Sequence, residues 1–357
     1  MRVGVLILLY MKILFGVLVL SVASVKAQTF TTETFGSGTN QFSIEFVEIK
    51  DVRNSSDTNG LGAVDYEFSI GKYEINRDAV LKINVTRNTN LILADMSSRG
   101  ANGPNYPATG LSWFECAQFV NSLNESKGIP PAYKFDQLGN FQQWTINDVG
   151  FDSGNPFRNK LARYVLPSID EWYKAAFYDP TKNNVGGFWK YPTKSDTAPL
   201  PIASGTNQNS AVYLQPNFLA GGELIGPAEI NNAGSLSYYG TMAQGGNVWE
   251  IMETASDLVN DSPNENRILK GGDWSVLYQN FIESSQTMSS EVSFKNSLGS
   301  SRGFRIAMKK ENVGSVTNTI LLVTQKTYDL VNWAPVYTNI IYDTNSKAFY
   351  RLQIEKP

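Results

Sequence analysis

The sequence of 357 residues contains no histidine and a single cysteine, Cys116. Histidine is the only side chain whose unperturbed pKa lies between about pH 5 and 8, and it is the commonest metal ligand. Its absence excludes serine triads, cysteine–histidine dyads and zinc hydrolases of the ordinary kind. One cysteine cannot form an intrachain disulfide or a two-cysteine redox couple. The folded chain must therefore be stabilised by packing.

Apolar runs that could cross a bilayer, which takes about 20 consecutive residues, are also missing. The run Ile13–Leu20 follows Met11 and Lys12, and small residues then lead to Ala27. This arrangement is typical of a secretory signal peptide over residues 1–27. We expect export to the periplasm, the cell surface or the medium, with no membrane insertion of the mature chain; a membrane anchor is the weaker alternative.

No excess of one charge is present either. The formal net charge is -3, and acidic and basic residues are interspersed rather than gathered in blocks. Nothing in this pattern predicts attraction to nucleic acid or to anionic lipid. We therefore expect neither nucleic acid nor anionic lipid as a partner.

Two capping boxes predict short helices. Ser112 with Glu115, and Ser168 with Glu171, have the spacing in which a serine and a glutamate satisfy each other's backbone N–H groups at a helix start. Cys116 falls on the apolar face of the first of these helices. Alternating apolar residues predict strands at residues 42–46 and 66–75.

Between residues 179 and 240 neither helical nor strand periodicity persists, so we expect long ordered loops. Near the end, residues 319–324, 334–341 and 348–354 have the composition of strands. They predict a small C-terminal β module over residues 313–357, after a main domain over residues 28–310.

Glycine pairs mark two further motifs. Gly245 and Gly246 precede Glu250, an arrangement of backbone and carboxylate oxygens that suits calcium. The alternative is a glycine turn before a buried Trp249, and the spacing favours it. Gly271 and Gly272 precede Asp273 in a similar turn.

Taken in order, six segments resemble the sulfatase-modifying-factor family, which includes the formylglycine-generating enzymes. The segments are FSIGKYEI (68–75), LSWFECAQF (111–119), VLPSIDEWYKAA (165–176), GGNVWE (245–250), LKGGDWS (269–275) and RGFRIA (302–307). The resemblance implies an α+β fold with little regular secondary structure, related in architecture to C-type lectin-like domains.

The resemblance also shows where this chain departs from the family. Active members bind copper through a pair of cysteines between the GGSW-like and GFR-like motifs, and residues 273–302 contain none. Other members of the superfamily bind iron through histidines, which this chain lacks. We therefore expect no catalytic residues and no cofactor, and Cys116 is interpreted as a buried structural thiol.

The family's calcium site, carried over, falls on Gly246, Val248 and Glu250. Its preceding side-chain ligand falls on Ala243, and a ligand of a second site falls on Val212, neither of which offers an oxygen. Calcium takes about 6 to 8 oxygen ligands. We expect weak calcium binding or none.

These departures predict a non-catalytic recognition protein that binds a protein or carbohydrate ligand through the loops between residues 179 and 273. The loop aromatic residues would supply contact area, or would instead anchor the loops to the core; they are Phe188, Trp189, Tyr191, Tyr213, Tyr238 and Tyr239. The main alternative is an oxidoreductase of the formylglycine-generating type.

Two further interpretations complete the prediction. Carboxylates, among them Asp170, Glu171, Glu253 and Asp257, could form an acid–base pair, but Glu171 has a capping role and the others more often face solvent. The tail resembles, more loosely, C-terminal β modules of exported bacterial proteins.

Overall fold

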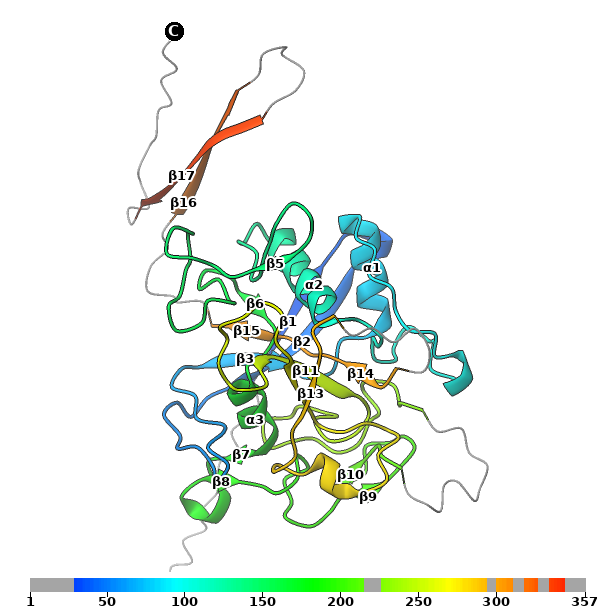
Figure 1. The fold of residues 1–357 in the computed structure, drawn as a ribbon. Coiled ribbons are helices and arrows are strands. Elements are labelled where there is room, and N and C mark those ends of the chain that lie inside the picture. Colours follow the sequence, from blue (N-terminus) through cyan, green and yellow to red (C-terminus); the bar gives the residue numbers. More distant parts are fainter. Residues whose placement is uncertain (1–28, 215–225, 294–299, 311–317, 327–333, 344–357) are drawn as a thin grey trace, which may run out of the picture.

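A computed structural model describes residues 29–214, 226–293, 300–310, 318–326 and 334–343. The expected signal peptide lies outside these residues. The chain has a mixed α and β architecture in which short helices and strands are joined by long ordered loops (Figure 1). This confirms the fold class predicted from the sequence.

The larger sheet brings together the two ends of the main domain. Its strand order is β1-β2-β3-β15-β6, and all neighbours are antiparallel. The strands are β1 Phe30–Phe35, β2 Phe42–Ile49, β3 Phe68–Gly71, β15 Ala307–Lys309 and β6 Tyr164–Val165. In β2 the buried residues include Phe42, Ile44 and Phe46, as the alternation predicts.

Strand β3 is shorter than the predicted strand over residues 66–75. The backbone leaves the sheet after Gly71, whose N–H donates to the carbonyl of Ile306. A Cβ at Gly71 would meet the carbonyl oxygen of Tyr73 at 3.0 Å. The chain bends here and carries Glu74 into the interior, where it is 2% exposed.

The second sheet has the order β13-β12-β11-β14. Its strands are β13 Met288–Ser290, β12 Arg267–Lys270, β11 Trp249–Ala255 and β14 Arg302–Gly303. β11 pairs antiparallel with β12 and parallel with β14, so that Glu250 lies opposite both Lys270 and Gly303. The pairing places three of the family-like motifs side by side.

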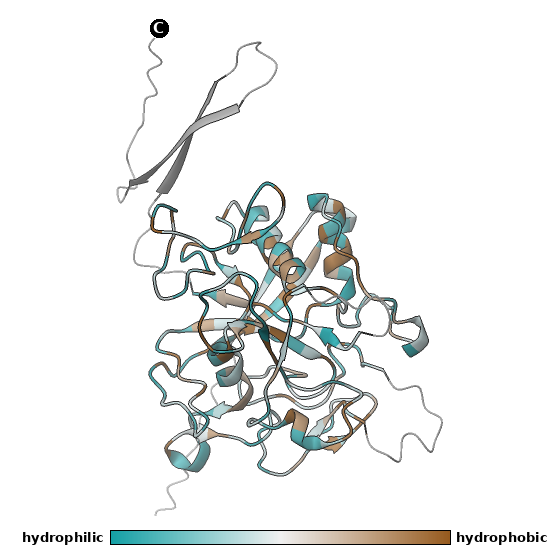
Figure 2. Cartoon of the chain, viewed as in Figure 1, coloured by the Kyte–Doolittle hydropathy of each residue, from teal (hydrophilic) through white to brown (hydrophobic). Residues whose placement is uncertain are grey.

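Both predicted helices are present with their capping boxes. α2 (Trp113–Ser126) begins after Ser112, and α3 (Ile169–Phe177) begins after Ser168; in each, serine and glutamate satisfy each other's backbone N–H groups. Figure 2 shows both hydrophobic and hydrophilic segments on α2. Its buried residues, including Val120, face the core.

A helix that was not predicted, α1 (Arg77–Arg87), follows β3. Asn76 caps it by accepting from the backbone N–H of Ala79 at 3.0 Å. The helix buries Val80 and Ile83 and ends at Asn88 in the left-handed conformation. An asparagine cap and an apolar face were the local signals for this helix. They were overlooked because the interpretation stopped at the strand predicted over residues 66–75.

Short strands and 3-10 helices interrupt the loops. They are β4 Lys134–Phe135 with β5 Phe141–Gln142, β7 Tyr178–Asp179 with β8 Gly187–Phe188, β9 Leu200–Pro201 with β10 Ser210–Ala211, and the 3-10 helices η1 Gly38–Asn40, η2 Ser97–Arg99, η3 Lys182–Asn184 and η4 Gln279–Ile282. In the described part of residues 179–240, regular structure stays short, as expected.

The C-terminal region contains a hairpin. β16 (Asn318–Lys326) and β17 (Ala334–Asp343) pair antiparallel, with a register shift between Thr324 and Gln325. They coincide with the first two strands predicted there, and the third, at residues 348–354, lies outside the described residues. None of the helices in the described ranges is long and apolar enough to cross a bilayer.

Candidate functional site

Glu250 and Arg305 form an ion pair with no exposed side-chain surface. Arg305 donates from Nε to Glu250 Oε2 at 2.5 Å and from Nη2 to Oε1 at 2.6 Å. Trp172 of α3 donates its Nε1–H to the same carboxylate at 2.8 Å. Arg305 also donates to the carbonyls of Gly71 and Met242. The two motif residues therefore tie β11, α3 and the end of β3 together.

The segment before Glu250 is a turn that requires glycine. Gly246 has a φ of +86°, and a Cβ there would lie 2.2 Å from the carbonyl oxygen of Val212. The N–H of Asn247 donates to that same carbonyl at 2.8 Å. Trp249, next in the chain, is 8% exposed. The interpretation of this motif as a glycine turn before a buried tryptophan is confirmed.

The residues assigned to a calcium site, Gly246, Val248 and Glu250, belong to this turn. The Glu250 carboxylate accepts from Arg305 through both oxygens, and the Val248 N–H donates to Glu74 Oε1 at 3.3 Å. In the described part of the chain, no three His, Cys, Asp or Glu side chains come together as a metal-binding group. Weak calcium binding or none stays a prediction.

Glu74 is a second buried carboxyl group beside this ion pair. Asn247 donates from Nδ2 to Glu74 Oε2 at 2.6 Å. Burial and the charge of Glu250 raise the pKa of Glu74 well above its ordinary value, against the opposing charge of Arg305. The Arg305 guanidinium pairs directly with Glu250, and only its charge acts on Glu74, so burial favours a neutral Glu74.

Glu171 and Glu253 meet in a separate network around Arg158. Arg158 donates from Nε to Glu253 at 2.8 Å and from Nη1 and Nη2 to Glu171 at 2.9 and 3.0 Å. Burial acts to raise the pKa of Glu171, but the charge and hydrogen bonds of Arg158 outweigh it and lower that pKa to about 2.

This network corrects the expectation that Glu253 faces solvent, because its side chain has no exposed surface. Tyr133 donates its hydroxyl to Glu253 at 2.6 Å. Both carboxylates are enclosed and paired with the same arginine, so they hold the core together and are not open to a substrate. Asp257 is exposed, as expected.

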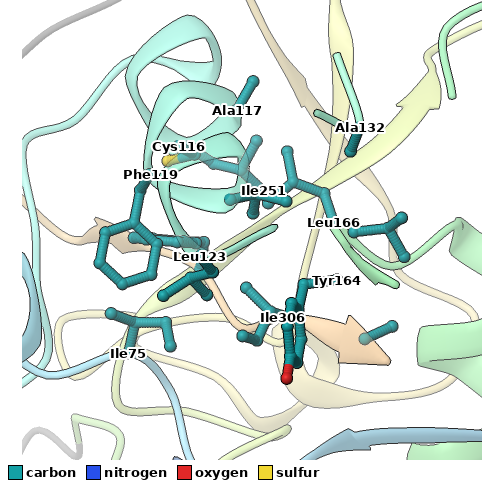
Figure 3. Packing of buried hydrophobic residues seen from close by; sticks show 14 of the residues in the cluster. Ile75, Cys116, Ala117, Phe119, Leu123, Ala132, Tyr164, Leu166, Ile251 and Ile306 are labelled. Atoms are coloured by element: carbon teal, nitrogen blue, oxygen red, sulfur yellow. The ribbon is translucent and has the colours of Figure 1, made fainter. Parts of the chain in front are cut away.

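Cys116 lies in α2 with no exposed surface. Figure 3 shows its sulfur packed in the hydrophobic core, in a cluster that includes Phe119, Leu123 and Ile251. Burial and the neighbouring charge of Glu115 raise the pKa of the thiol well above its ordinary value. A buried thiol with a raised pKa is inert as a nucleophile, which confirms the structural role expected for this cysteine.

The loop aromatic residues do not form an exposed surface. Tyr191, Tyr213 and Tyr239 are buried, and Phe188, Trp189 and Tyr238 are half-buried. Tyr213 donates its hydroxyl to the carbonyl of Pro199 at 2.6 Å, and Tyr239 donates to Asp51 at 3.0 Å. Of the two interpretations, anchoring to the core describes the three buried tyrosines, whereas Phe188, Trp189 and Tyr238 keep part of their surface exposed.

Two of these aromatic residues line a cavity of about 500 Å³. The loop after β2, the β8 segment and the chain after η4 meet there, and Figure 1 shows the blue loop after β2 close to β8. We call it the Asp57 cavity; its lining residues are Ser56, Asp57, Thr58, Phe188, Trp189, Lys190, Asp196 and Ser284. It falls partly within the loops expected to bind a ligand.

Asp57 is held rigidly in the wall of this cavity. Its Oδ1 accepts from the backbone N–H groups of Asn59 at 2.7 Å and Leu61 at 3.3 Å. Its Oδ2 accepts from the Asn59 side chain at 2.9 Å and from the Tyr173 hydroxyl. Hydrogen bonds to both carboxylate oxygens therefore fix the position of the Asp57 side chain.

Lys270 lies behind the cavity wall with no exposed surface. Its Nζ donates to the carbonyls of Ser284, at 2.7 Å, and Gln286, and lies 5.1 Å from the centre of the Tyr173 ring. Burial lowers the pKa of Lys270 to about 7, opposed by the charge of Asp57. Neither Asp57 nor Lys270 was predicted as a site residue. For Lys270 a usable signal existed, because this lysine ends an apolar strand directly before two glycines.

Comparisons with known proteins identify a family and support the fold. Residues 63–310 match the family model described as the sulfatase-modifying factor enzyme 1-like domain. Among solved structures, the Treponema denticola variable protein 1 is 16% identical, with a TM-score of 0.50 over 79% of this chain and 99% of that one. CarF is 16% identical, with a TM-score of 0.51 over 75% and 99%. No curated protein sequence matches the chain.

Proposed function

The chain belongs to the sulfatase-modifying factor enzyme 1-like domain family, and from this premise we propose that it is a non-catalytic member that recognises a ligand. Its family-like motifs hold the fold together, in part through the buried pair of Glu250 and Arg305. The family's oxidative chemistry, as inferred from active members, needs two cysteines. This chain has one in its whole length.

The observation that carries the proposal is the position of that one cysteine. Cys116 is fully buried and its pKa is raised by burial, so it cannot present a thiolate to copper(I), which prefers soft sulfur ligands. Among the methionines, Met288 is 46% exposed in β13 and has no second sulfur beside it in residues 273–302. The sulfur ligands that the family chemistry uses are therefore missing.

The proposed ligand is a protein or a carbohydrate, held by loops on a rigid core. Binding residues are found disproportionately on loops that a rigid scaffold positions. The loops around the Asp57 cavity meet this description, because buried aromatic rings and a fully hydrogen-bonded Asp57 fix their geometry. Export, proposed from the expected signal peptide, would bring this surface into contact with envelope or external ligands.

The experiment that tests the proposal is an oxidation assay. The purified mature protein is given copper(I), oxygen and a cysteine-containing peptide, and mass spectrometry follows conversion of the cysteine to formylglycine. We expect no conversion and no stoichiometric copper(I) binding. Copper-dependent turnover would overturn the proposal and establish the alternative oxidoreductase function. A Cys116→Ala variant is the control, because turnover that it abolishes would trace the chemistry to this thiol.

A further inference from the structure

The Asp57 cavity has balanced charges. Asp196 accepts from the Nζ of Lys182 at 2.8 Å, and Lys190 pairs with Glu283 at 3.1 Å. The remaining charged groups are Asp57 and the buried Lys270 behind it, whose charges act on each other. The charged groups that line the cavity are thus already paired or hydrogen-bonded, so a charged ligand would have to compete with these contacts. The cavity favours a neutral ligand.

Its aromatic wall is held in place. The Nζ of Lys182 lies 4.1 Å from the centre of the Trp189 ring, and Trp189 donates its Nε1–H to Asp179 at 3.1 Å. The Phe188 ring packs against Tyr173 and Tyr178, with centroid distances of 5.6 and 5.1 Å. Both rings are half-buried. A site whose rings are already fixed loses little entropy when it binds.

The backbone beside the cavity is fixed as well. Gly62 has a φ of +85°, and a Cβ there would lie 2.6 Å from the Phe188 ring. The N–H of Gly62 donates to Asp170 at 2.7 Å, which ties this loop to α3. The close approach holds the loop of residues 56–62 against β8, so the two walls of the cavity keep their spacing.

The remaining lining groups are polar and neutral. Ser56 and Thr58 are exposed and carry hydroxyls that donate and accept hydrogen bonds. The volume of about 500 Å³ lies within the range of small-molecule sites, roughly 300–1,000 Å³. Rigid rings, hydroxyl groups and balanced charge together suit a ligand that has apolar C–H faces and many neutral hydroxyls.

We propose that the Asp57 cavity binds a neutral saccharide, with one sugar face against the Trp189 ring and hydroxyls hydrogen-bonded to Thr58 and Asp196. This inference rests on the proposed recognition function and names its ligand class. Asp57 and Lys270 act as positioning residues that fix the wall.

The test uses immobilised neutral oligosaccharides of glucose, mannose, galactose, xylose and N-acetylglucosamine with the full mature chain, followed by calorimetry on any that bind. Thr58→Trp fills the cavity from an exposed position without touching the core. Thr206→Trp is the matched control, because Thr206 is exposed and lines a different cavity. We expect Thr58→Trp to weaken binding at least tenfold and Thr206→Trp to leave it within about twofold, with equal thermal midpoints.

Trp189→Ala is a second variant and removes the ring itself. We expect at least a tenfold loss of affinity, checked alongside a circular dichroism spectrum that matches the unmodified protein. No binding to any of these sugars up to ~10 mM, or binding that Thr58→Trp leaves unchanged, overturns the inference. Neither result bears on the proposed lack of catalytic activity, which the copper(I) oxidation assay tests separately.

Discussion

Arg305 shows how a residue that a motif singles out can be structural. Its guanidinium is fully buried and donates to Glu250 and to the backbone carbonyls of Gly71, Lys72 and Met242. A buried pair adds little over a hydrophobic replacement, but removal of one partner leaves an uncompensated charge in the core. Arg305 therefore matters mainly because its loss alone would leave the Glu250 carboxylate buried and unpaired.

Arg305→Met is expected to lower the free energy of unfolding by about 3–5 kcal/mol, because the Glu250 carboxylate loses the guanidinium that pairs with it. Urea unfolding followed by tryptophan fluorescence measures the change. Arg87→Met is the matched control; Arg87 pairs with Glu125 at the surface, and its loss is expected to cost less than about 1 kcal/mol. Equal effects of the two substitutions would contradict this account.

Lys270 predicts a dependence of stability on pH. Its pKa is lowered by burial to about 7 in the folded chain, whereas an unfolded lysine titrates near 10.4. Between these values the unfolded chain binds more protons, so the free energy of unfolding rises with pH. Lys174 and Lys309, whose pKa values burial lowers to about 8, act in the same direction.

Lys270→Met should remove on the order of 2 kcal/mol from the rise in unfolding free energy between pH 7 and 9. The comparison is urea unfolding of both proteins at the two pH values. Lys50→Met, at a half-exposed position, should retain the rise seen in the unmodified chain. A rise of the same size in Lys270→Met would show that the Lys270 charge is not desolvated.

At the scale of elements, the helices depend on their first turns. α3 begins at Ser168, whose side chain accepts from the backbone N–H of Glu171, and Glu171 returns a bond to the Ser168 N–H. Ser168→Ala is expected to cost about 1 kcal/mol. Ser126→Ala, at the exposed end of α2, should change stability by less than about 0.5 kcal/mol. Thermal and urea unfolding report both changes, and a neutral Ser168→Ala would refute the capping contribution.

Sequence patterns predicted elements where local signals agreed with the tertiary packing. The boxes at Ser112 and Ser168 are of this kind, because both partners lie within one helical turn. The bend at Gly71 was missed because pairing with β15, more than 200 residues later, sets the end of β3. The helix after Asn76 was missed with it, because the predicted strand ran on to residue 75.

At the scale of the whole molecule, buried tyrosine side chains anchor the long loops to the core. Gly246, Val248 and Glu250 remain the residues through which calcium is predicted to bind weakly or not at all. Weak extracellular sites have dissociation constants near 1 mM, so ~1 mM calcium should raise the free energy of unfolding by less than about 0.5 kcal/mol. Thermal unfolding with calcium, against magnesium at equal ionic strength, measures this. A larger, calcium-specific increase would reveal a site that these contacts do not predict.

The sequence by itself determined the capped helices and the glycine turn at Gly246, which depend on neighbours along the chain, and the lack of a second cysteine, which depends on composition. The fold class followed from six ordered motifs that resemble a known family. Only the tertiary structure decided which carboxylates share Arg158, that the loop tyrosines are anchors, and that Asp57, Trp189 and Ser284 line one cavity. Burial and pairing between distant residues set those outcomes, and no local pattern encodes them.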